Sequence, residues 1–153
     1  MPDYFPHDMH SMQHVFVYGT LRAGEANDIH RAARRHDIAE PVLMGRGHTP
    51  GRLYDFGSYP GLVLDPGAGP VRGDVYRVDA ALIPVLDEIE EVFPGVEGLF
   101  RSVRIDVTVN NDGHERVIDC LVYPVGENAV AGLTRIEKGD WVAYRRQLMD
   151  RHA

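Results

Sequence analysis

The stretch RSVRIDVTVNNDGHERVIDCLVYPV, residues 101–125, carries the clearest structural signal in this chain of 153 residues. In its first half, apolar side chains at 103, 105, 107 and 109 alternate with polar ones, which is the two-residue period of a strand with one buried face. The Asn-Asn-Asp-Gly run at 110–113 is typical of a tight turn, and residues 116–125 return as a second apolar segment. The sequence therefore predicts a β-hairpin here.

Before the hairpin, the chain has several short segments with strand or helix patterns. An apolar run at 15–18, closed by Gly19, predicts a buried strand, and Asn27 or Asp28 can cap a short helix after it. Residues 41–78 predict several short strands, of which 71–78 is the last. Turns are expected at Thr49-Pro50-Gly51, Tyr59-Pro60-Gly61 and Asp65-Pro66-Gly67.

Two more helices are expected, one on each side of the hairpin. The first begins near Ile83, with Pro84 in its first position, and runs to about Val92. The second is capped by Asp140, and its Trp141, Tyr144 and Leu148 share one face.

The order is strand, helix, several strands, helix, hairpin and helix, without the regular alternation of a doubly wound parallel sheet. The fold class predicted is α+β, with a small mixed, barrel-like β-sheet and flanking helices. Residues 1–13 are polar and predict a flexible N-terminal extension, and residues 14–153 are predicted to form a single domain.

Composition narrows the classes of function. The chain is 44% hydrophobic and 25% charged, as expected of a single globular domain, and its formal net charge of −7 argues against nucleic acid as a partner. No apolar run approaches the roughly 20 residues of a membrane span, so no membrane partner is expected. Cys120, the one cysteine, lies among apolar residues and is expected to be a buried thiol. These features predict a cytoplasmic protein; its oligomeric state is left open.

An acidic segment offers a candidate base. On a helix, Leu82, Leu86, Ile89 and Phe93 form an apolar stripe, and of the four carboxylates at 87, 88, 90 and 91 only that of Glu90 closely borders it. A carboxylate at an apolar edge is desolvated, which raises its pKa and suits a base that takes a proton from an amine. The alternative is an ordinary acidic helix face.

The segment that ends the first strand offers a candidate anion site. Tyr18, Gly19, Thr20 and Leu21 can present consecutive backbone N–H groups to a carboxylate or an oxyanion, although an ordinary turn would have the same sequence. Arg22 could meet a substrate carboxylate, or it could be an exposed arginine. Tyr59 and Tyr123 are candidates for a pocket wall, with a role as core or rim aromatics as the alternative.

Together these segments resemble the gamma-glutamylcyclotransferase-like family, in its AIG2-like or gamma-glutamylamine cyclotransferase branch. Residues 17–22, VYGTLR, are similar to the family's Tyr-Gly-Ser/Thr-Leu loop. Residues 86–91, LDEIEE, are similar to its Leu-Asp-x-x-Glu-Gly segment, with Glu91 in place of glycine. Weaker similarities follow in order at 51–54, 59–62, 71–76 and 139–141, so that the resemblance spans roughly Val15 to Tyr144. Phe100-Arg101 departs from the family's usual Tyr-x-Arg or Tyr-Arg.

The resemblance implies an enzyme, of transferase or lyase type, that cyclises a γ-glutamyl group to 5-oxoproline and releases the attached amine or amino acid. It makes Glu90 the general acid/base and residues 18–21 the cradle of the γ-glutamyl group, and it implies no cofactor. The γ-glutamylamine and γ-glutamyl-dipeptide branches fit better than the glutathione-specific one. One rival is a non-catalytic module that binds a small metabolite on the same fold; another is transfer of the γ-glutamyl group to water.

Histidines near the N-terminus raise the question of a metal site. His7, His10 and His14 are close in sequence, but their spacing reproduces no known zinc-ligand pattern. No metal is therefore expected.

Overall fold

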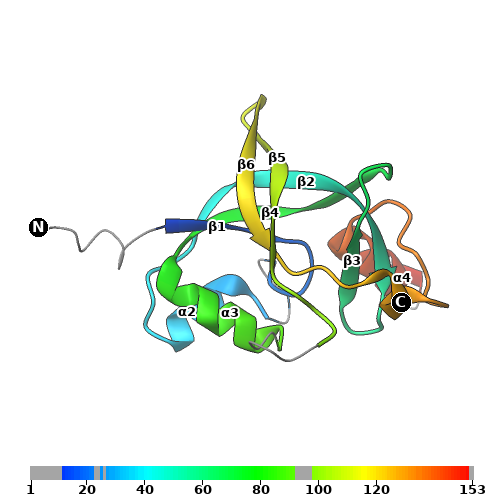
Figure 1. Cartoon of the computed structure of the whole chain (residues 1–153), viewed down its shortest axis with the longest axis horizontal. Coiled ribbons are helices and arrows are strands. Elements are labelled where there is room, and N and C mark those ends of the chain that lie inside the picture. The colour runs from blue at the N-terminus through cyan, green and yellow to red at the C-terminus, as the bar shows by residue number, and fades with distance from the viewer. Residues whose placement is uncertain (1–11, 23–24, 26, 92–97, 152–153) are drawn as a thin grey trace, which may run out of the picture.

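The computed structural model describes residues 12–22, 25, 27–91 and 98–151. The chain begins with strand β1 (Met12–Val17) and helix α2 (Ile29–Arg35) (Figure 1). Three strands follow: β2 (Val42–Asp55), β3 (Pro60–Leu64) and β4 (Pro70–Asp79). After helix α3 (Ile83–Ile89) come the hairpin strands β5 (Val103–Asn111) and β6 (His114–Val122) and helix α4 (Trp141–Arg151). Short 3₁₀ turns lie at Ala80–Leu82 and Glu127–Val130.

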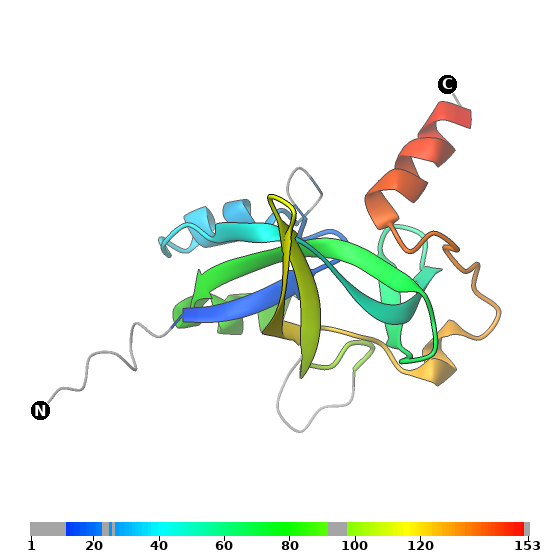
Figure 2. The same ribbon diagram turned by 90° about the horizontal axis from the view of Figure 1, so that it is seen from above.

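The strands form a closed mixed barrel. Their order is β3-β2-β4-β1-β6-β5, and a further pairing of β2 with β5 joins the two sides, so that β3 extends from the barrel along β2. The pairing of β1 with β6 is parallel, whereas the other pairings are antiparallel. Figure 2 shows α4 standing at the end of the barrel near β3, far from the start of β1. The predicted α+β class, the barrel-like sheet and the hairpin are confirmed.

Strand β2 was expected to be broken by a turn at Thr49-Pro50-Gly51, and this prediction is wrong. Pro50 lies inside β2, opposite Pro70, where β2 ends its pairing with β4 and starts its pairing with β3. A proline is tolerated there because the ladder changes partner at that point and needs no donor from it. Likewise, Tyr59-Pro60-Gly61 is not a turn as a whole, because Pro60 already begins β3.

A bulge in β2 gives the strand the curvature that closure needs. The register with β4 shifts between Leu43 and Gly45, and Gly45 has a φ of +145°. A Cβ at Gly45 would lie 2.8 Å from the carbonyl oxygen of Asn110 in β5. Glycine therefore permits both the bulge and the close approach of β5.

Alternate residues of β1 face two separate apolar clusters. Phe16 points into the barrel, where it belongs to the same apolar cluster as Trp141 and Cys120. The thiol of Cys120 is buried, as predicted, and burial raises its pKa to about 12. Val15 and Val17 face outward, and α2 and α3 cover them. Figure 1 shows these two helices at the same end of the barrel. Burial of both faces explains why residues 15–18 form a continuous apolar run.

The helix starts follow the sequence, and one helix end does not. Asp28 caps α2, Asp140 caps α4 and Pro84 lies in the first turn of α3, as predicted. Helix α3, however, ends at Ile89 rather than near Val92. At the N-terminus, Met12 and Gln13 already belong to β1, although they were expected to be part of the extension; residues 1–11 lie outside the described residues.

None of the helices in the described part of the chain has the length and apolar character that crossing a membrane requires.

Candidate active site

A cavity of about 610 Å³ lies where the loop after β1 meets the end of α3. The segment before β3 and residues 98–100 form its other walls, and Tyr123, just after β6, closes it. The cavity brings together most of the residues that the sequence predicted for the site. Its predicted members are Tyr18, Gly19, Thr20, Leu21, Tyr59, Glu90 and Tyr123.

Glu90 lies immediately after the last residue of α3. Its backbone N–H donates to the carbonyl of Leu86 at 2.9 Å, which fixes it against the apolar side of the helix. Burial raises the pKa of its carboxyl group from 4.5 to about 7. Its carboxylate has no hydrogen bond or ion pair with any described residue, and it lines the cavity. Glu88 on the same helix is exposed. Phe93, expected on the apolar stripe, lies outside the described residues.

The loop after β1 turns its carbonyl groups toward its own interior. The carbonyls of Gly19, Thr20 and Leu21 accept from the backbone N–H groups of residues 22, 27 and 29, at 2.8–3.0 Å. Within the described residues, the N–H groups of the same three residues donate no hydrogen bond. All three residues line the cavity, so this loop can supply several donors to an anionic group.

The hydroxyl groups of Tyr18 and Tyr123 already make hydrogen bonds within the protein. Tyr18 donates to the carbonyl of Tyr123 at 2.7 Å and accepts from the N–H of Leu62 at 3.2 Å. Tyr123 donates to Asp87 at 2.7 Å. Burial, together with the nearby carboxylates, raises the pKa of both tyrosines, which therefore stay protonated. These two residues shape the cavity and hold its walls together.

Aromatic rings form another wall of the cavity. Tyr59 stacks on Phe56, with ring centroids 5.3 Å apart, and tilts against Phe100 at 5.9 Å. Both Tyr59 and Phe100 line the cavity. The phenyl ring of Phe100 offers no hydroxyl, so its part of this wall is apolar.

A family model described as "Gamma-glutamyl cyclotransferase, AIG2-like" matches residues 15–143. The chain belongs to this family. The gamma-L-glutamyl-butirosin B gamma-glutamyl cyclotransferase of Niallia circulans is 36% identical over 140 residues, which are 89% of this chain and 80% of the relative. The gamma-glutamylaminecyclotransferase of Bos taurus is 34% identical over 114 residues, 71% of this chain and 63% of the relative. A crystal structure of an AIG2-like protein from Mus musculus superposes with a TM-score of 0.62 at 30% identity, covering 76% of this chain and 78% of the mouse chain.

Within the gamma-glutamyl cyclotransferase family motif, one departure has a conformational explanation. Glu91, which replaces the motif glycine, has a φ of +57°, and its N–H donates to the carbonyl of Glu88. This left-handed conformation ends α3 and is the one that favours glycine. Glu91 therefore adopts this conformation at a cost that glycine would not have, and it is the second acidic residue that lines the cavity.

For Arg22 the sequence left two roles open, contact with a substrate carboxylate or exposure to solvent, and the structure contradicts the second. Arg22 is buried and does not line the cavity. Its guanidinium lies 3.2 Å from Asp74 in β4 and 3.1 Å from Asp140 at the start of α4. The sequence prediction failed because both partners are distant in the chain and become neighbours only when the barrel closes.

Gly19 has a structural reason to be glycine besides any approach by a ligand. A Cβ at this position would lie 2.7 Å from Cγ and 2.8 Å from Cδ of Pro60. The close contact packs the loop against the start of β3. A branched side chain at Gly19 would therefore disturb the packing of the loop as well as fill the cavity.

Several residues of the cavity were not predicted from the sequence. They contribute a hydroxyl, an amide and apolar surface: Ser58, Asn27, Pro60, Leu99 and Phe100. Phe100 carried a signal through its departure from the family pattern, and Pro60 through the weaker similarity at 59–62. Of the three histidines considered as metal ligands, His14 lies in β1, and burial with three nearby arginines lowers its pKa. Across the described residues no group of three or more His, Cys, Asp or Glu side chains could hold a metal ion; His7 and His10 lie outside them.

Proposed function

We propose that the protein is a γ-glutamyl cyclotransferase that converts a small γ-glutamyl amide to 5-oxoproline and a free amine, with Glu90 as general acid/base. The observation that carries this proposal is the carboxylate of Glu90, with a pKa raised to about 7, in a cavity that residues 19–21 also line. Neither this carboxylate nor the N–H groups of residues 19–21 have a hydrogen-bond partner among the described residues. Family membership supports the general reaction class.

In this mechanism, the nucleophile is the substrate's own α-amino nitrogen. Glu90 removes one proton from the α-ammonium group, and the nitrogen attacks the γ-carbonyl carbon to form the five-membered ring. The bond between that carbon and the leaving nitrogen then breaks, and Glu90 returns the proton to the departing amine. The ring nitrogen loses its second proton to the released amine, which leaves as an ammonium ion while the ring keeps one N–H. Atoms and charges balance without an external reactant.

A base with a pKa near 7 is suited to both proton transfers. Near neutral pH both its ionised and its protonated forms are populated, so it can accept a proton before ring closure and donate one afterwards. The free N–H groups of the 19–21 loop are proposed to hold the anionic oxygens of the γ-glutamyl group and the oxyanion that develops on the γ-carbonyl. Holding the substrate folded lowers the entropic part of the barrier.

The charge of the cavity favours one class of leaving group. Among the described lining residues, Glu90 and Glu91 are ionisable acids and none is Lys, Arg or His. Residues 92–97, which follow Glu91 in the chain, also include no basic residue. An amine with a neutral or cationic remainder therefore fits better than an amino acid, whose free carboxylate would face Glu91. The names of two relatives refer to a γ-glutamyl conjugate of butirosin B and to γ-glutamylamines.

The rival functions predict different products. A panel of γ-glutamyl compounds with cationic, neutral and anionic leaving groups should release 5-oxoproline, fastest from the cationic and neutral members. Release of glutamate instead would indicate transfer to water, and binding without turnover would indicate a non-catalytic module. The absence of 5-oxoproline from every compound at pH 7–8 would refute the proposal.

A further inference from the structure

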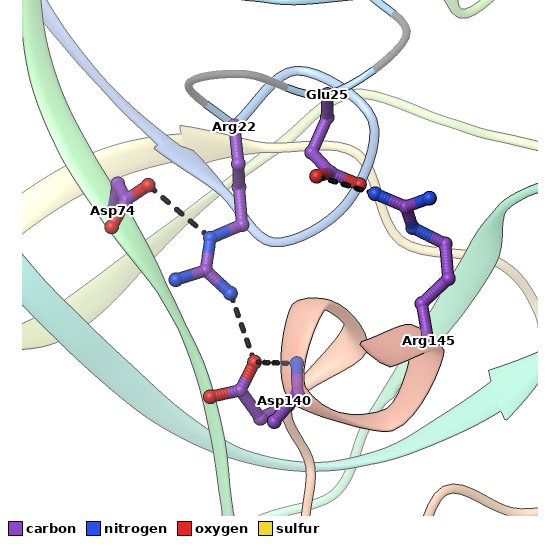
Figure 3. A network of polar contacts seen from close by, with 6 residues as sticks. Arg22, Glu25, Asp74, Asp140 and Arg145 are labelled. Atoms are coloured by element: carbon purple, nitrogen blue, oxygen red, sulfur yellow. Dashed lines mark hydrogen bonds and ion pairs between the residues drawn. The ribbon is translucent and has the colours of Figure 1, made fainter. Parts of the chain in front are cut away.

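Two ion pairs, each with its loop residue buried, join the loop after β1 to the C-terminal helix α4 (Figure 3). The first is that of Arg22, whose side chain is only 10% exposed and bridges Asp74 and Asp140. The second is that of Glu25, which is 8% exposed and lies 2.8 Å from Arg145 in α4. Arg22 and Glu25 are thus both held by elements that are distant in the chain.

The Arg22 backbone connects this network to the candidate site. Its N–H donates to the carbonyl of Gly19 at 3.0 Å, and its own carbonyl accepts from Glu25 at 3.0 Å. The guanidinium of Arg22 therefore anchors the turn at residues 19–21. The carbonyls of this turn accept hydrogen bonds from the loop itself, and its N–H groups have no partner among the described residues. A shift of Arg22 would turn the peptide groups of residues 19–21.

Asp140 has two roles at once. Its Oδ1 accepts from the N–H of Ala143 at 3.2 Å, which caps α4, and from Nη1 of Arg22 at 3.1 Å. The start of α4 is fixed to the barrel because Trp141 lies in the barrel core. Through Asp140, the loop after β1 is therefore attached to a part of α4 that is packed in the barrel core.

We infer that Arg22 and Glu25 are positioning residues for the γ-glutamyl site, and that α4 sets the orientation of the loop amides through Asp140 and Arg145. The inference rests on the proposed function insofar as the amides bind the γ-glutamyl group. It assigns a role in the site to a helix that does not line the cavity.

The chain offers a matched control for Arg22. Arg52 also bridges two carboxylates, with its Nε 3.0 Å from Asp65 and its other end on Glu127, and its side chain is 20% exposed. It is not among the residues that line the cavity. Arg22→Lys and Arg52→Lys keep the charge, but each loses the planar fork that can reach two carboxylates.

The test compares these two variants in two measurements. We expect Arg22→Lys to lower the ¹⁵N order parameters of the Gly19, Thr20 and Leu21 amides from about 0.85 toward 0.6 or below. We expect its calorimetric Kd for 5-oxoproline to rise about 10-fold or more, because misplaced donors bind poorly. Arg52→Lys should change neither. Unchanged order parameters and Kd in a folded Arg22→Lys would overturn the inference.

Kinetics separate positioning from a merely structural role. In Arg22→Lys, KM for a γ-glutamyl substrate should rise, while the apparent pKa of the kcat/KM profile should stay that of the wild type. A fall in Tm equal to that of Arg52→Lys, with KM unchanged, would indicate a structural role only. If the amides loosen but wild-type protein binds no 5-oxoproline, the proposed function fails and the positioning role stands.

A second pair of variants keeps the test decisive if Arg22→Lys does not fold. Arg145 is 41% exposed, so Arg145→Met should fold, and Glu25→Gln removes the other charge of that pair. Each substitution should raise the Kd for 5-oxoproline. The Kd of the double variant should be no higher than that of the single variant with the higher Kd. Strictly additive effects, or none, would exclude the link through α4.

Discussion

Replacement of Glu90 by glutamine tests both the chemistry and the electrostatics of the site. The substitution is nearly isosteric, but the amide cannot accept a proton from the substrate's ammonium group. Cyclisation should fall by about 10²–10⁴-fold, the usual contribution of a positioned acid–base group. Wild-type kcat/KM should rise with pH through an apparent pKa of about 7, since only the ionised carboxylate is a base.

The same substitution has a calculable effect on stability. The pKa of Glu90 rises from 4.5 to about 7 on folding. At about 1.4 kcal/mol per pKa unit, ionisation of this carboxyl lowers the free energy of unfolding by at most about 3 kcal/mol. Between pH 4.5 and 7 the folded state binds more protons than the unfolded state. The wild-type free energy of unfolding therefore falls as pH rises through this window. The glutamine variant has no such slope.

Urea unfolding followed by the fluorescence of Trp141, the single and buried tryptophan, measures this difference. Relative to wild type, Glu90→Gln should gain stability between pH 5 and pH 8, by an amount approaching 3 kcal/mol less the cost of burying an amide. Exposed Glu88 gives the control: Glu88→Gln should stay within about twofold of wild-type activity and show no such gain.

Two results would refute the reasoning. Equal rates of 5-oxoproline release by Glu90→Gln and Glu88→Gln, with a confirmed substrate, would exclude Glu90 as the base. A stability difference between Glu90→Gln and wild type that does not change with pH would show that the Glu90 carboxyl is not desolvated in the folded protein.

Four further predictions concern the surroundings of Glu90. Glu91→Gly should raise the free energy of unfolding by up to about 1 kcal/mol, because the left-handed conformation suits glycine, and should slow turnover of cationic conjugates more than of neutral ones; loss of stability would contradict this. Gly19→Ala should lower Tm, since its Cβ would meet Pro60; an unchanged Tm would show that the loop yields freely. Tyr18→Phe should cost about 1–3 kcal/mol in urea unfolding by leaving the buried N–H of Leu62 without an acceptor; a neutral effect would argue against that bond. Chelator treatment should leave activity and Tm unchanged, and a loss restored by zinc would reopen the question of a metal site.

Much of the local structure was determined by the sequence. The hairpin follows from alternation and its Asn-Asn-Asp-Gly turn, and the caps at Asp28 and Asp140 satisfy donors only two or three residues away. The place of Glu90 at the edge of an apolar stripe also follows from helical spacing. These features depend on residues close in the chain, so the pattern alone carries them.

Closure of the barrel and the surroundings of the site were decided by the tertiary structure. Parallel pairing of β1 with β6 brings the hydroxyl of Tyr18 to the carbonyl of Tyr123, 105 residues away in the chain. Arg22 likewise donates to Asp140, which is 118 residues away. From the sequence, Arg22 could be taken for an exposed arginine, because no periodic pattern indicates a partner so distant in the chain. Its burial is determined by which strands become neighbours, and that depends on packing of the whole chain rather than on any segment of it.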